Sequence, residues 1–344
     1  MLTKGTLCWC CVCVFGPVDT MLSFLIVLLF ASDVVYGVGL SKTMRAPQSF
    51  SPSHIRLNDA GVACLTRSIK TPDPVPEEGR DAVLRAMESG RLFRYNVASA
   101  DESEVSGCEG DLASYTGFKF ALGMNSCGSA LFVSMLCAGV RPGDRVLTNG
   151  FTFTAGPSAI VHAGAEPIYV ECTQGLIVDL EDLEAKMMES GAKYFMISHM
   201  RGKVADMDAV VELCKKHDVI LLEACAHALG VLWKDGHCGK HGVIASQSYK
   251  MLNSGEGGLL ATDDDDYFAR AMEYACAYES LAAKHVVAPS QEALRRAMDG
   301  SIPNYSLRMH EATAAMIRPQ ISTIDERRID YNVRYDSVCA RLRE

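Results

Sequence analysis

The sequence has no excess of positive charge, and this absence limits the partners it can bind. Its 33 lysines and arginines are outnumbered by 42 aspartates and glutamates, so the formal net charge is -9 at pH 7. Nucleic-acid binding needs a basic surface that neutralises phosphates. The composition therefore gives no support for a nucleic-acid partner and favours a small metabolite or another protein. With 49% hydrophobic and 22% charged residues, the chain is expected to be globular, neither disordered nor a multispan membrane protein.

Motifs for several common kinds of site are also missing. No G-x-S-x-G elbow occurs, so a Ser-His-Asp triad is not indicated. Outside the N-terminal stretch, the cysteines form no C-x-x-C pair, which favours free or buried thiols in a reducing compartment over a disulfide framework. The segment His237–His241 contains the ligand types of zinc sites but not their spacing, and no second ligand pair follows. We therefore expect a surface loop there and no metal site.

The N-terminal stretch looks like a targeting segment. Residues 5–40 are almost free of charge, and Met21–Ala31 resembles the apolar core of a signal peptide, although it is short for a membrane span. Residues 34–58 have no acids and carry basic residues and serines, as transit peptides do. We expect residues 1–57 to direct the protein to the secretory route or an organelle. A membrane anchor or a misassigned start codon are the alternatives, and without such a signal the protein would be cytoplasmic. Four cysteines are interpreted as apolar residues of this segment, with metal binding or acylation as alternatives: Cys8, Cys10, Cys11 and Cys13.

From Phe118 onward, short apolar runs alternate with helical stretches. Six runs rich in branched and aromatic residues predict strands: 120–125, 145–149, 167–172, 193–198, 219–224 and 243–249. Between them, apolar residues recur at helical spacing. This alternation predicts an α/β fold with a mostly parallel sheet and helices on both faces. Ligands bind beyond the carboxyl ends of the strands in such sheets, so the strand-to-helix junctions should carry the function.

The residues after Ala261 are expected to be mainly helical. The acidic run Asp263–Asp266 is interpreted as the first turn of a helix, whose dipole favours negative charge, rather than as a cation site. A long amphipathic stretch begins near His310, is interrupted by Pro319, and is not followed by another strand. We expect three parts after the targeting segment: an N-terminal arm (58–110), a large α/β domain (111–265) and a truncated C-terminal small domain (266–344).

Three junctions contain residues suited to chemistry. Small residues at Asn125–Ala130 would expose backbone N–H groups at a helix N-terminus as a phosphate cradle, although a tight turn needs small residues in any case. Lys250 ends an apolar strand before a Gly-rich turn, where partial desolvation would lower its pKa and allow an imine with an aldehyde cofactor. An isolated lysine would more often be a surface residue. His227 follows another strand and could bind a cofactor hydroxyl, although a lone histidine is more often a solvated or core group.

Taken together and in order, these junctions resemble the DegT/DnrJ/EryC1/StrS family, the sugar aminotransferases of pyridoxal-phosphate (PLP) fold type I. The similarity runs from about Pro74 to the end of the chain, and its strongest segments are 125–131, 141–146, 151–170, 198–210, 223–230, 248–264 and 304–320. The resemblance implies PLP as cofactor, bound by the domain 111–265. It also implies an amino acid such as glutamate as donor and a keto sugar, nucleotide-linked, as acceptor. The family is dimeric, so a homodimer is implied, with Arg308 reaching the cofactor phosphate of the partner subunit.

The resemblance also assigns roles to the residues of the junctions. Lys250 matches the lysine that binds the cofactor aldehyde and later moves the α-proton of the substrate. Gly128 and Ser129 match the backbone donors to the cofactor phosphate. Phe153 stands where an aromatic ring stacks on the pyridine, and His227 where a Gln or His meets the phenolic oxygen.

One expected residue is absent. The family has an aspartate after the glutamate of its E-D-x-A-[QH] motif, and this chain has Ala224 there. That carboxylate keeps the pyridine nitrogen protonated, so that the ring accepts electrons from the carbanion. Without it we expect weaker carbanion stabilisation. Glu223 and Cys225 should point to the opposite face of the sheet, so neither replaces the carboxylate.

A second family residue, the phosphate-binding serine five positions before the lysine, is Ala245 here, and Ser246 or Ser248 could compensate. These departures, together with the early end of the chain, leave three interpretations. The protein is an active aminotransferase, or it is a lapsed enzyme that acts as a scaffold or as the dimer partner of an intact paralogue. In the third, the sequence comes from a truncated gene prediction with an error at Ala224, since a change from aspartate to alanine needs only one base.

Overall fold

The computed structural model describes residues 55–57, 59, 63–65, 72–234, 236–239, 243–245, 250–276 and 281–343. Most of the expected targeting segment, together with Ser246 and Ser248, lies outside these residues. The chain divides into two units, one formed by Pro72–Asn332 and the other by Met1–Thr71 with Val333–Glu344. In the described ranges, no helix combines the length and the hydropathy that a membrane crossing requires.

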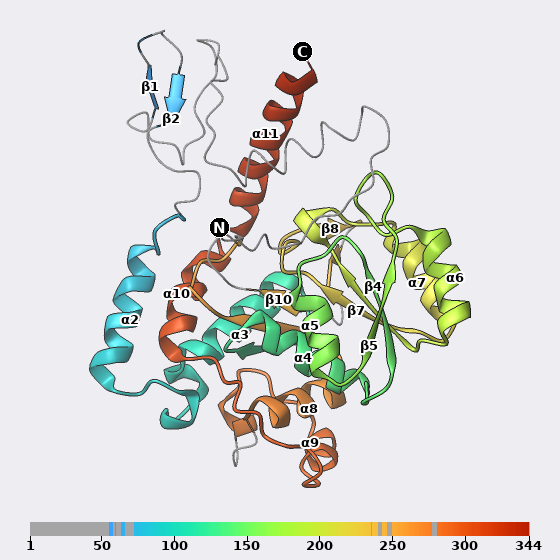
Figure 1. The fold of residues 1–344 in the computed structure, drawn as a ribbon. Coiled ribbons are helices and arrows are strands. Elements are labelled where there is room, and N and C mark those ends of the chain that lie inside the picture. The colour runs from blue at the N-terminus through green and yellow to red at the C-terminus, as the bar shows by residue number, and fades with distance from the viewer. Residues whose placement is uncertain are drawn as a thin grey trace, which may run out of the picture. The chain divides into compact units, whose positions relative to one another are not determined.

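A seven-stranded sheet forms the centre of the unit Pro72–Asn332 (Figure 1). In spatial order its strands are β3 (Phe120–Met124), β11 (Gly258–Thr262), β10 (Val243–Ala245), β7 (Ile220–Ala224), β6 (Tyr194–Ser198), β4 (Arg145–Asn149) and β5 (Glu166–Val170). Neighbouring strands pair in parallel except at β11, which is antiparallel to both β10 and β3. The predicted, mostly parallel sheet is confirmed.

Helices pack on both faces of this sheet. The described residues contain ten α-helices in all. They are α2 (Glu77–Ser89), α3 (Glu104–Thr116), α4 (Cys127–Ala138), α5 (Ala155–His162), α6 (Leu180–Ser190), α7 (Met207–Lys216), α8 (Asp265–Cys276), α9 (Gln291–Ala297), α10 (Glu311–Ile321) and α11 (Ile324–Arg343). One face of the sheet shares a hydrophobic cluster with α4, α5 and α8. The other face packs against α3 and α10 at one end and against α6 and α7 at the other. Because successive strand residues alternate between faces, neighbours such as Glu223 and Ala224 point to opposite faces of the sheet.

The remaining elements are short. They are the hairpins β1 (Ile55–Leu57) with β2 (Ala63–Leu65) and β8 (Leu232–Trp233) with β9 (Gly236–His237), and the 3₁₀ helices η2 (Arg94–Asn96), η3 (Ala100–Glu102), η4 (Met200–Gly202) and η5 (Leu281–Lys284). The expected acidic helix start is present, since α8 begins at Asp265 and its first turn bonds to Lys119 and Arg296. Pro319 lies inside α10, and the helix continues beyond it and ends at Ile321. The boundaries of the three predicted parts, including a truncated C-terminal small domain, stay predictions.

Two expectations differ from the structure. The strand β11 was not expected, because Gly258–Thr262 follows a Gly-rich turn and is buried along its whole length, so it lacks the alternation that marks a half-exposed strand. The segment beginning at His237 is not simply a surface loop. His237 belongs to β9, and the Cys238 side chain is buried in the core cluster beneath α3 and α10, because the β8–β9 hairpin turns it inward.

Candidate active site

A single pocket brings together most of the residues expected to carry chemistry. Gly128, Phe153, His227 and Lys250 line it, and so does Ala224, the position of the missing aspartate. These residues come from the N-termini of α4 and α5, from the end of β7 and the turn after it, and from the segment before β11. The pocket therefore lies at the carboxyl ends of the parallel strands, as the strand–helix alternation predicted. We call it the lysine pocket.

The N-terminus of α4 forms one wall of the lysine pocket. Ser126 caps the helix, because its Oγ accepts the N–H of Ser129 at 3.0 Å and its carbonyl accepts the N–H of Ala130 at 3.1 Å. The N–H groups of Cys127 and Gly128 belong to the first turn, where a helix provides no acceptor. Gly128 thus offers a backbone donor at the positive end of the helix dipole, whereas the Ser129 amide is engaged in the cap.

The Gly-rich turn brings the start of β11 against this helix terminus. A Cβ at Gly258 would lie 2.5 Å from the carbonyl carbon of Ser126 and 2.6 Å from the amide nitrogen of Cys127. Only glycine fits such a close backbone approach. The turn after Lys250 therefore closes the cradle around the amide groups of α4, which gives the glycine pattern its physical reason.

Lys250 and His227 form the polar centre of the pocket. The Lys250 Nζ lies 2.9 Å from the His227 Nε2, and the backbone N–H of Arg201 donates to the His227 Nδ1 at 3.3 Å. Burial is the main cause that lowers the pKa of Lys250 below its ordinary value of 10.5; the Arg201 charge adds to this, and Cys127 acts against it. Burial, followed by the charges of Lys250 and Arg201, lowers the pKa of His227 to about 4. Both shifts favour the neutral forms, and a neutral amine is the form that attacks an aldehyde.

Phe153 provides an apolar ring at the mouth of the pocket. It precedes α5, its side chain is 58% exposed, and its ring centroid lies 5.9 Å from the Lys250 Nζ. A large aromatic ring left this open near a nucleophile is available to cover a planar ligand.

Ala224 leaves the β7 side of the pocket without a carboxylate. Glu223 lies on the other face, where its Oε2 accepts the N–H of Gly239 at 3.0 Å and bonds to the His199 Nε2 at 3.1 Å. Cys225 is buried in the core on that face. The expectation that neither neighbour replaces the aspartate is therefore consistent with the geometry.

The cluster of Glu223, His199 and Cys225 also has the composition of a metal site. Its ligand-type atoms lie within 4.8 Å of one another. One carboxylate oxygen of Glu223 already binds both the imidazole and a backbone amide, so the cluster is satisfied as a structural hydrogen-bond network that anchors the turn after β6.

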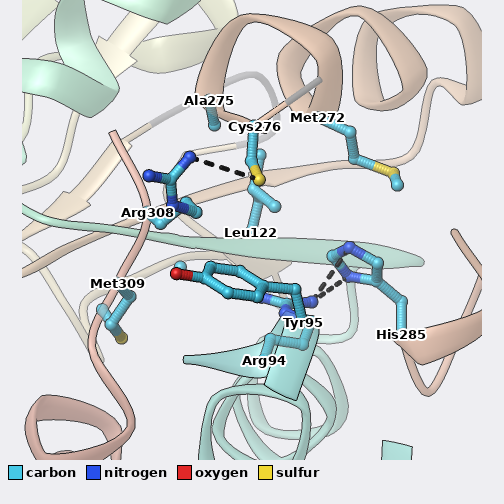
Figure 2. A pocket seen from close by; sticks show the side chains of 10 residues that line it. Arg94, Tyr95, Leu122, Met272, Ala275, Cys276, His285, Arg308 and Met309 are labelled. Carbon is cyan, nitrogen blue, oxygen red and sulfur yellow. Dashed lines mark hydrogen bonds between the residues drawn. The ribbon is translucent and has the colours of Figure 1, made fainter. Parts of the chain in front are cut away.

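Arg308 does not join the lysine pocket of its own chain. It lines a second pocket together with Arg94, Tyr95 and His285, which we call the arginine pocket (Figure 2). Its guanidinium lies 5.7 Å from the Tyr95 ring centroid, and it donates to the Cys276 Sγ at 3.6 Å. Its expected role toward a partner subunit stays a prediction.

A buried ionic network beside the arginine pocket was not anticipated from the sequence. Glu109 on α3 pairs with Arg94 and with the His285 Nδ1, and it accepts the backbone N–H of Gly123 at 2.7 Å. Burial alone would raise the pKa of Glu109, but Arg94 and His285 outweigh it and lower the pKa to about 2. These residues are far apart in the sequence, and no local pattern links them.

The α/β fold, with its mostly parallel sheet, matches that of aminotransferases of the PLP-dependent fold type I class. The chain belongs to the DegT/DnrJ/EryC1/StrS aminotransferase family, whose model matches residues 77–342. The aminotransferases of this family depend on PLP. The resemblance found in the sequence is confirmed.

Relatives of known description support this membership. The spore coat polysaccharide biosynthesis protein SpsC of Bacillus subtilis (strain 168) is 29% identical over 262 residues, which cover 73% of this chain and 63% of that protein. The L-glutamine:2-deoxy-scyllo-inosose aminotransferase of Streptomyces lividus is 30% identical over 260 residues, covering 73% and 60%. The crystal structure of 3-amino-5-hydroxybenzoic acid synthase matches with a TM-score of 0.64 and 25% identity over 74% of this chain and 64% of that one. The chain thus spans less than two thirds of the length of each.

Proposed function

We propose that the protein is a PLP-dependent aminotransferase that moves an amino group from an amino acid such as glutamate to a nucleotide-linked keto sugar. The observation that carries this proposal is the Lys250–His227 pair, held next to the glycine-lined amide cradle of α4. The similar protein of Streptomyces lividus is an L-glutamine:2-deoxy-scyllo-inosose aminotransferase, which supports the same reaction type.

The residues of the lysine pocket fit most of the cofactor. When bound, PLP supplies an aldehyde that takes up amino groups and a ring that stabilises negative charge beside them. The Gly128 amide would hold its phosphate, Phe153 would cover its ring, and the Nε2 of His227 would face its hydroxyl. Lys250 would capture the aldehyde and then carry the proton to and from the substrate carbon. At the pyridine nitrogen the fit fails, because Ala224 offers no acceptor for a proton there.

We further propose that two copies of the chain form a dimer and that the Arg308 of each copy serves the lysine pocket of the other. The location of Arg308 in a separate pocket of its own chain supports this proposal. The N-terminal segment is proposed to determine the compartment, as a cleaved signal or as an anchor.

A second candidate function is favoured by Ala224. A chain without the pyridine carboxylate could bind PLP and yet turn over poorly, serving as the dimer partner of an intact relative. The two functions differ in what Ala224→Asp does. In a lapsed enzyme this change restores amino transfer, whereas an active enzyme transfers without it. Ala226→Asp, which adds a carboxylate to the same pocket at another position, is the matched control.

The test uses the full chain, PLP and visible spectroscopy. The proposal expects a visible absorption band of covalently held PLP that glutamate or glutamine converts to the amino form of the cofactor. The band should disappear in Lys250→Ala and persist in Lys193→Ala, a lysine on the surface. If saturating PLP gives no band in the unsubstituted chain, the aminotransferase proposal is wrong. A band that neither donor converts supports the lapsed enzyme.

A further inference from the structure

The short turn η4 after β6 has an unusual backbone beside the lysine pocket. Arg201 adopts φ 59° and ψ 23°, the left-handed region that residues with a side chain rarely occupy. The next residue, Gly202, also has positive φ, and a Cβ on it would lie 3.1 Å from the carbonyl oxygen of His227. The turn is therefore pressed against the segment that carries His227. Such a conformation persists only where surrounding contacts hold it, and it is typical of functional sites.

The hydrogen bond made by this turn restricts where His227 carries its proton. The backbone N–H of Arg201 donates to the Nδ1 of His227, so Nδ1 must be an unprotonated acceptor. A neutral imidazole has one proton, which is then on Nε2. The atom 2.9 Å from this Nε2 is the Nζ of Lys250. An Nε2–H donor requires an acceptor, and the only form of a lysine amine that accepts is the neutral one.

The alternative protonation state breaks the network. A charged Lys250 ammonium can only donate, so the Nε2 of His227 would have to accept and the imidazole proton would move to Nδ1. It would then point at the N–H of Arg201, and the hydrogen bond between the two turns would be lost. Among the described residues, the other ionisable groups that act on Lys250 or line the same pocket are the Cys127 thiol, the Arg201 guanidinium and the Glu256 carboxylate. Burial raises the pKa of Cys127 to about 11, so the thiol adds no charge near neutral pH.

We propose that Arg201 is a positioning residue whose strained backbone N–H fixes the Nε2–H tautomer of His227 and thereby keeps the Lys250 amine neutral, ready to attack an aldehyde. The side chain of Arg201 adds a positive charge near the amine, but the amide provides the directional contact. This role deepens the proposed function and rests on it, since it assigns Arg201 to the preparation of the lysine that the cofactor would meet.

The first test is the tautomer itself, measured in the full chain without PLP. Nitrogen-15 NMR of protein labelled at histidine distinguishes a protonated ring nitrogen from an unprotonated one. The His227 signals are assigned as those missing in His227→Gln. The proposal expects the proton on Nε2 at pH 7.5. A proton on Nδ1, or rapid exchange between the two nitrogens, overturns it.

The second test compares Arg201→Pro with Arg201→Gly. Both remove the guanidinium. Pro also removes the amide proton and cannot adopt the positive φ, so the contact with His227 is lost, whereas Gly keeps the amide proton and accepts the positive φ without strain. The rate at which formaldehyde and cyanoborohydride label Lys250 is followed by mass spectrometry against pH, with circular dichroism to confirm folding. We expect the Pro variant to shift the midpoint upward by about one pH unit relative to Gly, which is about tenfold slower labelling at pH 7.5. Equal midpoints contradict the proposal.

These outcomes are separate from those of the proposed function. Neither the tautomer nor the labelling needs PLP or turnover, so a chain that passes both tests but does not bind PLP contradicts only the aminotransferase proposal. A chain that binds PLP with the proton of His227 on Nδ1 contradicts only the role of Arg201. If Arg201→Pro does not fold, the tautomer of the unsubstituted chain decides the matter.

Discussion

The lysine pocket and the arginine pocket contain similar kinds of side chain and place them in opposite electrostatic states. In the lysine pocket, Lys250 and His227 touch each other, and burial shifts the pKa of both toward the neutral form. Beside the arginine pocket, Glu109 is fully ionised and enclosed by Arg94 and His285. Burying a charge is costly unless it is paired. One region avoids the cost by losing charge and the other by pairing it. The neutral Lys250 amine is suited to react, whereas the paired charges of the Glu109 network are suited to stabilise the fold.

Breaking the paired region should have the largest effect on stability. In Glu109→Gln the Arg94 charge stays buried without its carboxylate, and we expect a loss of about 3–5 kcal/mol in the free energy of unfolding. Urea unfolding of the full chain measures it. The matched control is Glu102→Gln, which removes an exposed pair with Arg91 and should cost no more than about 1 kcal/mol. Similar losses in the two variants would show that the Glu109 network is not the stabilising feature we describe.

Filling the cradle of the lysine pocket should have the next largest effect. In Gly258→Ala the added methyl group meets the backbone of Ser126 and Cys127, so we expect a loss of about 1–3 kcal/mol in the free energy of unfolding, together with weaker PLP binding. Gly236→Ala adds the same methyl group where no atom lies within 4 Å. Thermal unfolding and a PLP titration of both variants measure these effects. If the two variants behave alike, the close approach of β11 to α4 contributes neither to stability nor to PLP binding.

The pH dependence of the free energy of unfolding should distinguish the two pockets by a smaller effect. His227 has its pKa lowered to about 4, so the unfolded chain binds a proton at higher pH than the folded chain does. Its contribution to stability is present above the ordinary histidine value near 6.5 and is lost as the pH falls toward 4. The contribution of Glu109, with its pKa lowered to about 2, is present above its ordinary value of 4.5 and is lost below it. His227→Gln should therefore reduce the slope of stability against pH between about 6.5 and 4, by at most about 3 kcal/mol in total.

The remainder of the slope between these values belongs to other histidines, since burial also lowers the pKa of His285 and His237. Urea unfolding at several pH values provides the measurement. An unchanged slope in His227→Gln would mean that His227 titrates normally in the folded chain.

Features that depend on neighbouring residues could be predicted from the sequence. The bounds of β4 at Arg145–Asn149 match the expected strand, and the opposite orientations of Glu223 and Ala224 follow from the alternation of side chains along a strand. The cradle at Gly128 could be predicted because the strand, the small-residue turn and the helix that form it are contiguous in the sequence. The proposed role of Lys250 could be predicted only from the order of several segments, because a lysine before a glycine turn is common by itself.

Features that depend on distant segments could not be predicted. The buried network forms only when the sheet and its helices assemble, because it joins Arg94, Glu109 and His285. No spacing of residues in the sequence predicts it. The contact between Arg201 and His227 joins the turns after two adjacent parallel strands, and it depends on a backbone angle that the arginine itself does not favour. The strand β11 was also not predicted. It is buried on both faces, so it lacks the alternation of polar and apolar residues that identifies a half-exposed strand.

In the proposed function, Lys250 is the group that captures the cofactor. The most direct test is to incubate the full chain with PLP near pH 7.5, reduce it with borohydride, digest it, and locate the pyridoxyl group by mass spectrometry. We expect near-stoichiometric labelling of Lys250, with little on exposed lysines such as Lys193 and Lys234. Labelling spread over the surface lysines, with Lys250 unmodified, would contradict it.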